Sequence, residues 1–326
     1  MAFCSERGDV MKRIFPIVAV ALCVALGMFA LVGCSSGSSG SSGSNGGSPA
    51  FNYDGTIEKT TIVDNDILTV TADELTYENN QATLALTITN KTAGELQVAA
   101  STLAYPANFI NGYMVPDGWF NKDVAAGATE TAEASFSLDE LRMYGIKGIN
   151  DIGLGIYATD SNYDTVYQDV STIKTSLGDS YSDSSFKDAI NDSSIQSALN
   201  ATITNSNVDL GALTYNGLQF NTVVLAKNSD GENALMFEVE NTTDVPMIMQ
   251  CHHLKVNDQL AYEYAVESVY LEPGKKRVAT VDLSYYLEEA ELSDLNDSIT
   301  NVTFTYSLID EKYNTLAGDT EASLTF

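Results

Sequence analysis

The sequence of 326 residues has few of the residue types that most often carry chemistry. It contains two histidines, His252 and His253, and four cysteines. Beyond residue 50 it has no Gly-x-Ser-x-Gly motif, and it has neither a phosphate-binding glycine loop nor a Cys-x-x-Cys pair anywhere. These absences disfavour a serine hydrolase, a phosphoryl-transfer enzyme or a thiol oxidoreductase. We therefore expect no catalytic residue and no cofactor.

Positive charge is also scarce. The chain has 16 Lys and Arg residues against 44 Asp and Glu residues, which gives a net charge of −28. Such a surface repels nucleic acid and anionic lipid head groups. We accordingly expect no nucleic-acid partner, and the acidity favours solubility at a crowded surface over any specific cation site.

Long apolar runs are limited to one. Lys12 and Arg13 precede an uncharged run over residues 14–33, which is the order of a secretory signal peptide. Because residues 1–10 add nothing to such a signal, Met11 is the expected start. The run is also long enough to be a transmembrane helix, which is the alternative reading.

The end of this run resembles the lipobox of bacterial lipoproteins. Leu31-Val32-Gly33-Cys34 has a branched apolar residue, small residues and then a cysteine. The resemblance implies cleavage after residue 33 and a diacylglyceryl group on Cys34, which would hold the protein at the extracytoplasmic face of a membrane. Two acyl chains suffice for stable anchoring. Residues 34–50 are rich in Ser and Gly and are predicted to be a flexible tether.

Cysteine usage agrees with export. Cys4 and Cys23 lie in the segment that would be removed, and Cys34 would carry lipid, so Cys251 is left alone. No intramolecular disulfide can then form. The fold must depend on its hydrophobic core.

From residue 51 onward the sequence predicts an all-β fold of sandwich type. Short runs rich in Val, Ile, Thr, Leu and Tyr alternate with Asn, Asp and Gly clusters. Residues 82–89 alternate apolar with polar or small side chains, as a strand with one buried face does.

The same order of segments recurs about 150 residues later. Asn90 corresponds to Asn241 and Gly127 to Gly274, and a short helical piece is expected near 138–144 and near 284–292. We expect two sandwich domains, 51–178 and 205–326. Residues 179–204 would link them through a short amphipathic helix with two pairs of apolar residues four apart, namely Phe186 with Ile190 and Ile195 with Leu199. We expect this helix to pack on a sandwich, and the alternative is that it only spaces the two domains.

The repeated unit resembles an immunoglobulin-like module, DUF4352-like or DUF5067-like, that recurs in bacterial lipoproteins of unknown function. The resemblance rests on the strings ITNKTAGELQVAAS, NGYMVP, VAAGATETAEASFSLDEL and GINDIGLGIYATD. It covers most of residues 67–175 and, more loosely, 215–326. It implies two tandem immunoglobulin-like sandwiches without catalytic residues. The second copy departs from the family pattern at Asn257-Asp258, where the family has Asn-Gly.

Two groups of residues are candidates for a site. On a strand, Met247, Met249, Cys251 and His253 would share one face, a row of soft ligands that suits copper. The repeat offers the other reading, because the counterparts of the first three are the core-type residues Leu96, Val98 and Ala100. We therefore interpret Cys251 as a core residue and keep a metal site formed by Cys251 and His253 as the alternative.

Aromatic residues form the second group and could recognise a peptide, protein or glycan. Because sandwich strands routinely bury aromatic side chains, we favour the structural reading, in which they belong to the core, and keep a binding patch as the alternative. The aromatic candidates are Tyr113, Trp119, Phe120, Tyr262, Tyr264 and Tyr270.

Residues 160–164 have the opening spacing of a calcium-binding loop but lack its later ligands, so we interpret them as a turn.

The leading functional hypothesis is a non-catalytic surface module that binds a partner or supports envelope architecture. The second hypothesis is a metal-handling lipoprotein, and the third is an envelope hydrolase.

Overall fold

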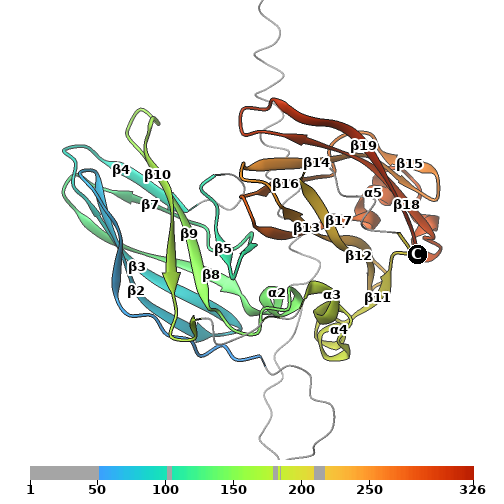
Figure 1. Cartoon of the computed structure of the whole chain (residues 1–326), viewed down its shortest axis with the longest axis horizontal. Coiled ribbons are helices and arrows are strands. Elements are labelled where there is room, and N and C mark those ends of the chain that lie inside the picture. Colours follow the sequence, from blue (N-terminus) through green and yellow to red (C-terminus); the bar gives the residue numbers. More distant parts are fainter. Residues whose placement is uncertain (1–50, 101–104, 179–182, 184, 209–216) are drawn as a thin grey trace, which may run out of the picture.

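The computed structural model describes residues 51–100, 105–178, 183, 185–208 and 217–326. The predictions for the signal peptide, Cys34 and the tether fall on residues 1–50 and lie outside the described residues. Antiparallel sheets dominate the described part, which confirms the all-β sandwich fold. Figure 1 shows two sandwich modules side by side.

The first module has two sheets around its core. One sheet consists of β1 (Thr60–Asp64), β2 (Leu68–Glu78), β3 (Gln81–Asn90) and β8 (Thr129–Ser137). The facing strands are β4 (Leu96–Ala100), β5 (Phe109–Ile110), β6 (Tyr113–Met114), β7 (Phe120–Val124), β9 (Asp151–Thr159) and β10 (Thr165–Lys174). The predicted alternation in β3 is confirmed, because Ala82, Leu84, Leu86 and Ile88 are all buried.

The second module repeats this plan. Its first sheet consists of β11 (Ala201–Asn205), β12 (Leu218–Asn228), β13 (Asn233–Asn241) and β17 (Lys276–Asp282). The facing sheet consists of β14 (Met247–Val256), β15 (Gln259–Tyr262), β16 (Glu267–Leu271), β18 (Asn301–Ile309) and β19 (Thr315–Thr325). Because β11 pairs with β12, the second module takes in residues that the sequence assigned to the linker.

Equivalent turns in the two modules are held by equivalent hydrogen bonds. Asn90 ends β3 and its Nδ2 donates to the Gly94 carbonyl at 2.7 Å, while Asn241 ends β13 and donates to the Val245 carbonyl at 2.8 Å. Gly127 and Gly274 have φ angles of 68° and 67°. The structure thus supports the pairing of segments read from the sequence.

The departure at Asn257-Asp258 keeps both turn residues at positive φ angles. Asn257 and Asp258 have φ angles of 48° and 64°, and the matching Asn111 and Gly112 have 49° and 84°. Asn and Asp tolerate this left-handed region better than other side chains do. An Asp can therefore stand where the other copy has Gly.

Each module also has the short helix that the sequence predicts. Helix α2 (Leu138–Met143) begins after Ser137 and α5 (Leu283–Glu289) after Asp282, and both capping side chains accept a hydrogen bond from a backbone N–H of the first turn. Helix α5 is followed by the short 3₁₀ helix η3 (Ser293–Asp297).

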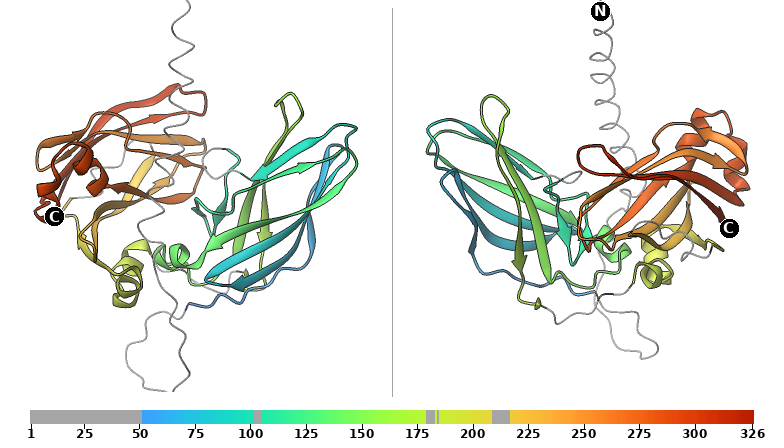
Figure 2. Two further views of the ribbon diagram at one scale, coloured as in Figure 1. Left: turned by 180° about the vertical axis from the view of Figure 1, so that it is seen from behind. Right: turned by 45° about the horizontal axis from the view of Figure 1, so that its top comes forward.

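The linker contains two short helices where one was expected. Helix α3 (Phe186–Ile190) ends before Asp192, whose side chain accepts a hydrogen bond from the Ser194 N–H and so begins α4 (Ser193–Leu199). Phe186, Ile190 and Ile195 are buried. The predicted packing of this segment on a sandwich is confirmed, and Figure 2 shows the two helices beside α2 at the junction of the modules.

Each module has its own hydrophobic cluster, and each cluster takes in residues of the other module. Strand β6 pairs in parallel with β17, through Tyr113 and Lys276, and joins strands of both modules into one ten-stranded sheet. The hydrophobic cluster of the first module includes Met236 and Val278 of the second. Strand β13 is therefore buried on both faces, as its continuous apolar run Ala234–Phe237 would allow.

Candidate functional site

Cys251 is a core residue, as predicted. Met247, Met249 and Cys251 are at most 1% exposed and point inward from β14. Burial raises the pKa of the Cys251 thiol well above its ordinary value, and the Glu267 carboxylate adds to the shift. A thiol held in its protonated form is a poor nucleophile and a poor metal ligand.

The counterparts of this row in the first module have the same environment. Leu96, Val98 and Ala100 on β4 are at most 2% exposed. The comparison between the two copies therefore predicted the buried face of β14 correctly for Met247, Met249 and Cys251.

The prediction that His253 shares the face of Cys251 is wrong. His253 has a φ of 53°, and the pairing of β14 with β18 shifts between His252 and Lys255, so the strand has a bulge there. Leu254 takes the next inward position, whereas His253 is exposed. Cys251 and His253 thus point away from each other. Among the described residues, no group of three or more His, Cys, Asp or Glu side chains is arranged to hold a metal.

The two histidines open instead onto a surface hollow of about 410 Å³. The hollow includes two carboxylates and no Lys or Arg. It is lined by residues of β14, the β15–β16 turn, β18 and β19, namely Gln250, His252, His253, Glu263, Tyr264, Ala265, Ser307 and Asp319.

His252 favours its neutral form in this setting. Its Nε2 lies 3.4 Å from Oδ1 of Asp319, and its ring centroid lies 4.7 Å from that of His253. Partial burial lowers the pKa of His252, the neighbouring His253 lowers it further, and Asp319 opposes both. The hollow therefore keeps a negative electrostatic character at neutral pH.

Ser307, His252 and Asp319 together have the composition of a hydrolase triad. A working triad needs the serine hydroxyl within hydrogen-bond reach of the imidazole. Within the part of the chain that the structure describes, the Ser307 hydroxyl makes no hydrogen bond to either histidine. Ser307, His252 and Asp319 therefore do not form the hydrogen-bonded chain of a triad in this structure.

A row of tyrosines continues from the hollow toward α5. The ring of Tyr264 lies 5.9 Å from that of Tyr262, which lies 4.8 Å from Tyr286, and Tyr286 lies 5.2 Å from Tyr285. Tyr264 is 71% exposed and Tyr285 43%, whereas Tyr286 is buried. We call Tyr262, Tyr264, Tyr285 and Tyr286 the tyrosine row.

The local sequence explains this row. Tyr262 and Tyr264 are two residues apart, at the end of β15 and just after it, so both can point outward. The cap at Asp282 places Tyr285 and Tyr286 early in α5, with Tyr286 on its buried face. The predicted candidates Tyr262 and Tyr264 therefore belong to one surface, while Tyr285 and Tyr286 were missed because the sequence does not reveal which strand lies beside the helix.

The aromatic candidates of the first module do not form a surface patch. Tyr113 and Phe120 are buried, with exposed fractions of 5% and 6%, and only Trp119 is exposed, at 65%. Tyr113 stacks on Tyr144 with ring centroids 5.7 Å apart. Burial supports the structural reading of Tyr113 and Phe120 over their weaker reading as binding residues, because both side chains belong to the core of the first module. Tyr270 is buried in the same way.

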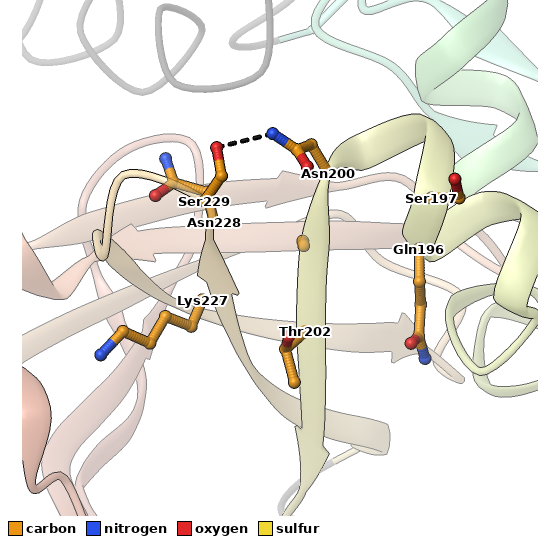
Figure 3. A pocket seen from close by; sticks show the side chains of 8 residues that line it. Gln196, Ser197, Asn200, Thr202, Lys227, Asn228 and Ser229 are labelled. Carbon is orange, nitrogen blue, oxygen red and sulfur yellow. Dashed lines mark hydrogen bonds between the residues drawn. The ribbon is translucent and has the colours of Figure 1, made fainter.

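A second hollow, of about 280 Å³, lies between α4, β11 and β12. In Figure 3 the Asn200 side chain reaches across to Ser229, with a hydrogen bond of 2.6 Å. Lys227 instead pairs with Asp297 at 2.8 Å. The hollow is lined by small and polar residues without an aromatic ring, so we regard it as the weaker candidate.

Residues 160–164 form a turn between β9 and β10, as predicted. The Asp160 carboxylate accepts hydrogen bonds from the backbone N–H groups of Asn162 and Asp164, at 2.8 and 3.1 Å, and these bonds lower its pKa. Asp310 makes the same two bonds, with Lys312 and Asn314. In each turn the aspartate carboxylate is therefore occupied by hydrogen bonds from the backbone of that turn.

No family model and no curated protein matches the chain. Among solved structures, the exo-chitosanase of Amycolatopsis orientalis is similar over 76% of this chain, at 14% identity and a TM-score of 0.23, and the matched part is only 26% of the exo-chitosanase. Chicken MD-1 complexed with lipid IVa matches 37% of this chain and 99% of its own, at 14% identity and a TM-score of 0.19. A protein of unknown function from Porphyromonas gingivalis W83 matches 79% of this chain and 99% of its own, at 12% identity and a TM-score of 0.20. Scores this low carry no argument about function.

None of the helices in the part of the chain that the structure describes has the length and hydrophobicity of a membrane span.

Proposed function

We propose that this protein is a lipid-anchored, extracytoplasmic lipoprotein whose folded part binds a partner and catalyses no reaction. The observation that carries the binding role is the tyrosine row beside the hollow of the second module. Exposed tyrosines supply a large contact area at a small entropic cost, since each side chain has only two rotatable bonds. The ring contacts hold these side chains in place before a ligand arrives, which lowers the cost of binding.

The proposed anchor rests on the sequence. Leu31-Val32-Gly33-Cys34 follows an apolar run that begins after two basic residues, and a Ser/Gly-rich stretch follows it. Diacylglyceryl on Cys34 would hold the tether at the membrane and leave the modules free to meet a partner.

The anchor is tested by labelling cells with an alkyne fatty acid. We expect label on the native protein and on Cys251→Ala, which removes the other cysteine of the exported part. We expect neither label nor membrane retention for Cys34→Ala. A Cys34→Ala protein that still takes up label would contradict the proposed anchor.

The absence of catalysis is tested at the hollow with p-nitrophenyl acetate as an activated ester. The full chain is expected to hydrolyse it no faster than Ser307→Ala and His252→Ala do, because no serine–imidazole hydrogen bond prepares a nucleophile. If turnover by the native protein is lost in both variants, the protein is a hydrolase.

A further inference from the structure

The hollow beside the tyrosine row has the charge pattern of a cation site. Glu263 and Asp319 contribute its two carboxylates, and both side chains are exposed. The lining residues include no Lys or Arg to neutralise them. A positively charged group in the hollow would therefore meet two acids and no Lys or Arg.

The aromatic wall of the hollow favours the same ligand charge. Tyr264 lines the hollow and is 71% exposed, so its ring is free to contact a ligand. The negative face of an aromatic ring attracts ammonium and guanidinium groups placed within about 6 Å of its centre. One aromatic ring and two carboxylates thus line the same hollow.

Charge complementarity extends beyond the hollow. At the far end of the tyrosine row, Glu289 lies four residues after Tyr285 on α5, so an acid lies on the same face of the helix as that ring. The chain as a whole has 44 acidic and 16 basic residues. Its long-range field therefore attracts cations and repels anions.

We propose that the hollow binds the side chain of a lysine or arginine in a basic peptide segment of a partner protein, with the rest of that segment lying along the tyrosine row. This assignment rests on the proposed binding role and names the chemistry of its ligand. The cationic group sits between Glu263 and Asp319 against the face of Tyr264. Neighbouring apolar parts of the peptide contact Tyr262 and Tyr285.

The test measures binding of fluorescein-labelled tetralysine to the full chain in detergent by fluorescence anisotropy. A salt concentration of about 150 mM screens long-range attraction between exposed charges. Glu263→Gln combined with Asp319→Asn removes both carboxylates and is expected to weaken binding about tenfold. Tyr264→Ala is expected to weaken it about threefold. Equal thermal midpoints for all variants verify that folding is intact.

A matched control separates a site from general attraction to an acidic surface. Glu74→Gln combined with Glu133→Gln removes two exposed acids of the first module, and so makes the same change in net charge. This pair is expected to change binding less than about twofold. An equal loss in both double variants would overturn the proposal, as would equally tight binding of tetraserine. The lipid anchor is tested separately by labelling of Cys34, so neither outcome of the binding experiment bears on it.

Discussion

The hydroxyl of Tyr113 in the first module donates a hydrogen bond of 2.7 Å to Oε2 of Glu238 in the second, and both side chains are buried. Oε1 of Glu238 accepts a bond of 2.9 Å from Asn221 and lies 3.7 Å from the ammonium group of Lys276. A buried carboxylate is costly unless its oxygens have partners. The first module therefore supplies a partner that the second module does not have alone.

The first prediction is that Tyr113→Phe destabilises the protein. It leaves Oε2 of Glu238 without its donor, and hydrogen bonds to charged groups contribute about 1.5–3 kcal/mol. Tyr77→Phe is the matched control, because its hydroxyl donates to the neutral carbonyl of Gly55 at 2.9 Å, a bond worth about 0.5–1.5 kcal/mol. Urea unfolding followed by circular dichroism measures both losses. A smaller loss for Tyr113→Phe than for the control would show that the junction contributes little.

The second prediction is that the two modules unfold together. Met236 and Val278 of the second module lie in the cluster of the first, and Phe109 of the first lies in the cluster of the second. Labelling of Cys251 in urea reports on the second module alone, whereas circular dichroism reports on both. We expect coincident midpoints, and two separate midpoints would show that the modules are independent despite the residues that each contributes to the other's cluster.

The third prediction concerns Cys251. Because the thiol is fully buried, the native protein should resist a thiol reagent that labels it readily in denaturant. Cys251→Ala should cost about 1 kcal/mol, as small truncations in a core do. His253→Ala serves as the control, since this exposed side chain should contribute less than about 0.5 kcal/mol. Rapid labelling of the folded protein would disprove the burial of Cys251.

The fourth prediction is a pH dependence centred on Glu140. Burial, followed by the nearby Asp117 carboxylate, raises the pKa of Glu140 to about 8, against an ordinary value of 4.5. Between these two values the folded state keeps a proton that the unfolded state releases, so the stabilisation present below pH 4.5 is lost as the pH rises toward 8.

Glu140→Gln removes this titration and keeps an acceptor for the Tyr144 hydroxyl. Its free energy of unfolding should therefore fall less between pH 5 and pH 8 than that of the native protein, and the variant should be the more stable of the two at pH 8 by at least about 1 kcal/mol. Glu133→Gln, at an exposed position on β8, should follow the native profile. Parallel profiles for all three proteins would refute the assignment.

The last prediction concerns the tips of two equivalent hairpins. Tyr163 and Tyr313 have φ angles of 64° and 62° and are 84% and 71% exposed. A left-handed backbone costs a residue with a Cβ roughly 1–2 kcal/mol, and glycine escapes this cost but loses more entropy on folding. Tyr163→Gly should therefore stabilise the protein by about 0.5 kcal/mol, whereas Tyr163→Ala, which keeps the Cβ, should not. A destabilised glycine variant would mean that the Tyr163 ring has a structural contact.

Features that depend on neighbouring residues could be predicted from the amino-acid sequence. Alternation predicted the buried face of β3, and the matched Asn90 and Asn241 located equivalent turns, because a strand's period and a side chain's bonds to its own turn are local properties. The comparison of the two copies also predicted the burial of Cys251, since equivalent strands bury equivalent faces.

Which faces are covered by distant segments became clear from the folded chain. The bulge at His253 follows from the pairing of β14 with β18, and the burial of Tyr113 follows from the contact of β6 with β17. The tyrosine row likewise forms because α5 packs beside β15. In each case the contact is made by residues that are far apart in the chain, and no local sequence pattern specifies which of several apolar surfaces will meet. For this reason the sequence identified Tyr262 and Tyr264 as candidates but could not connect them to Tyr285 or to the hollow.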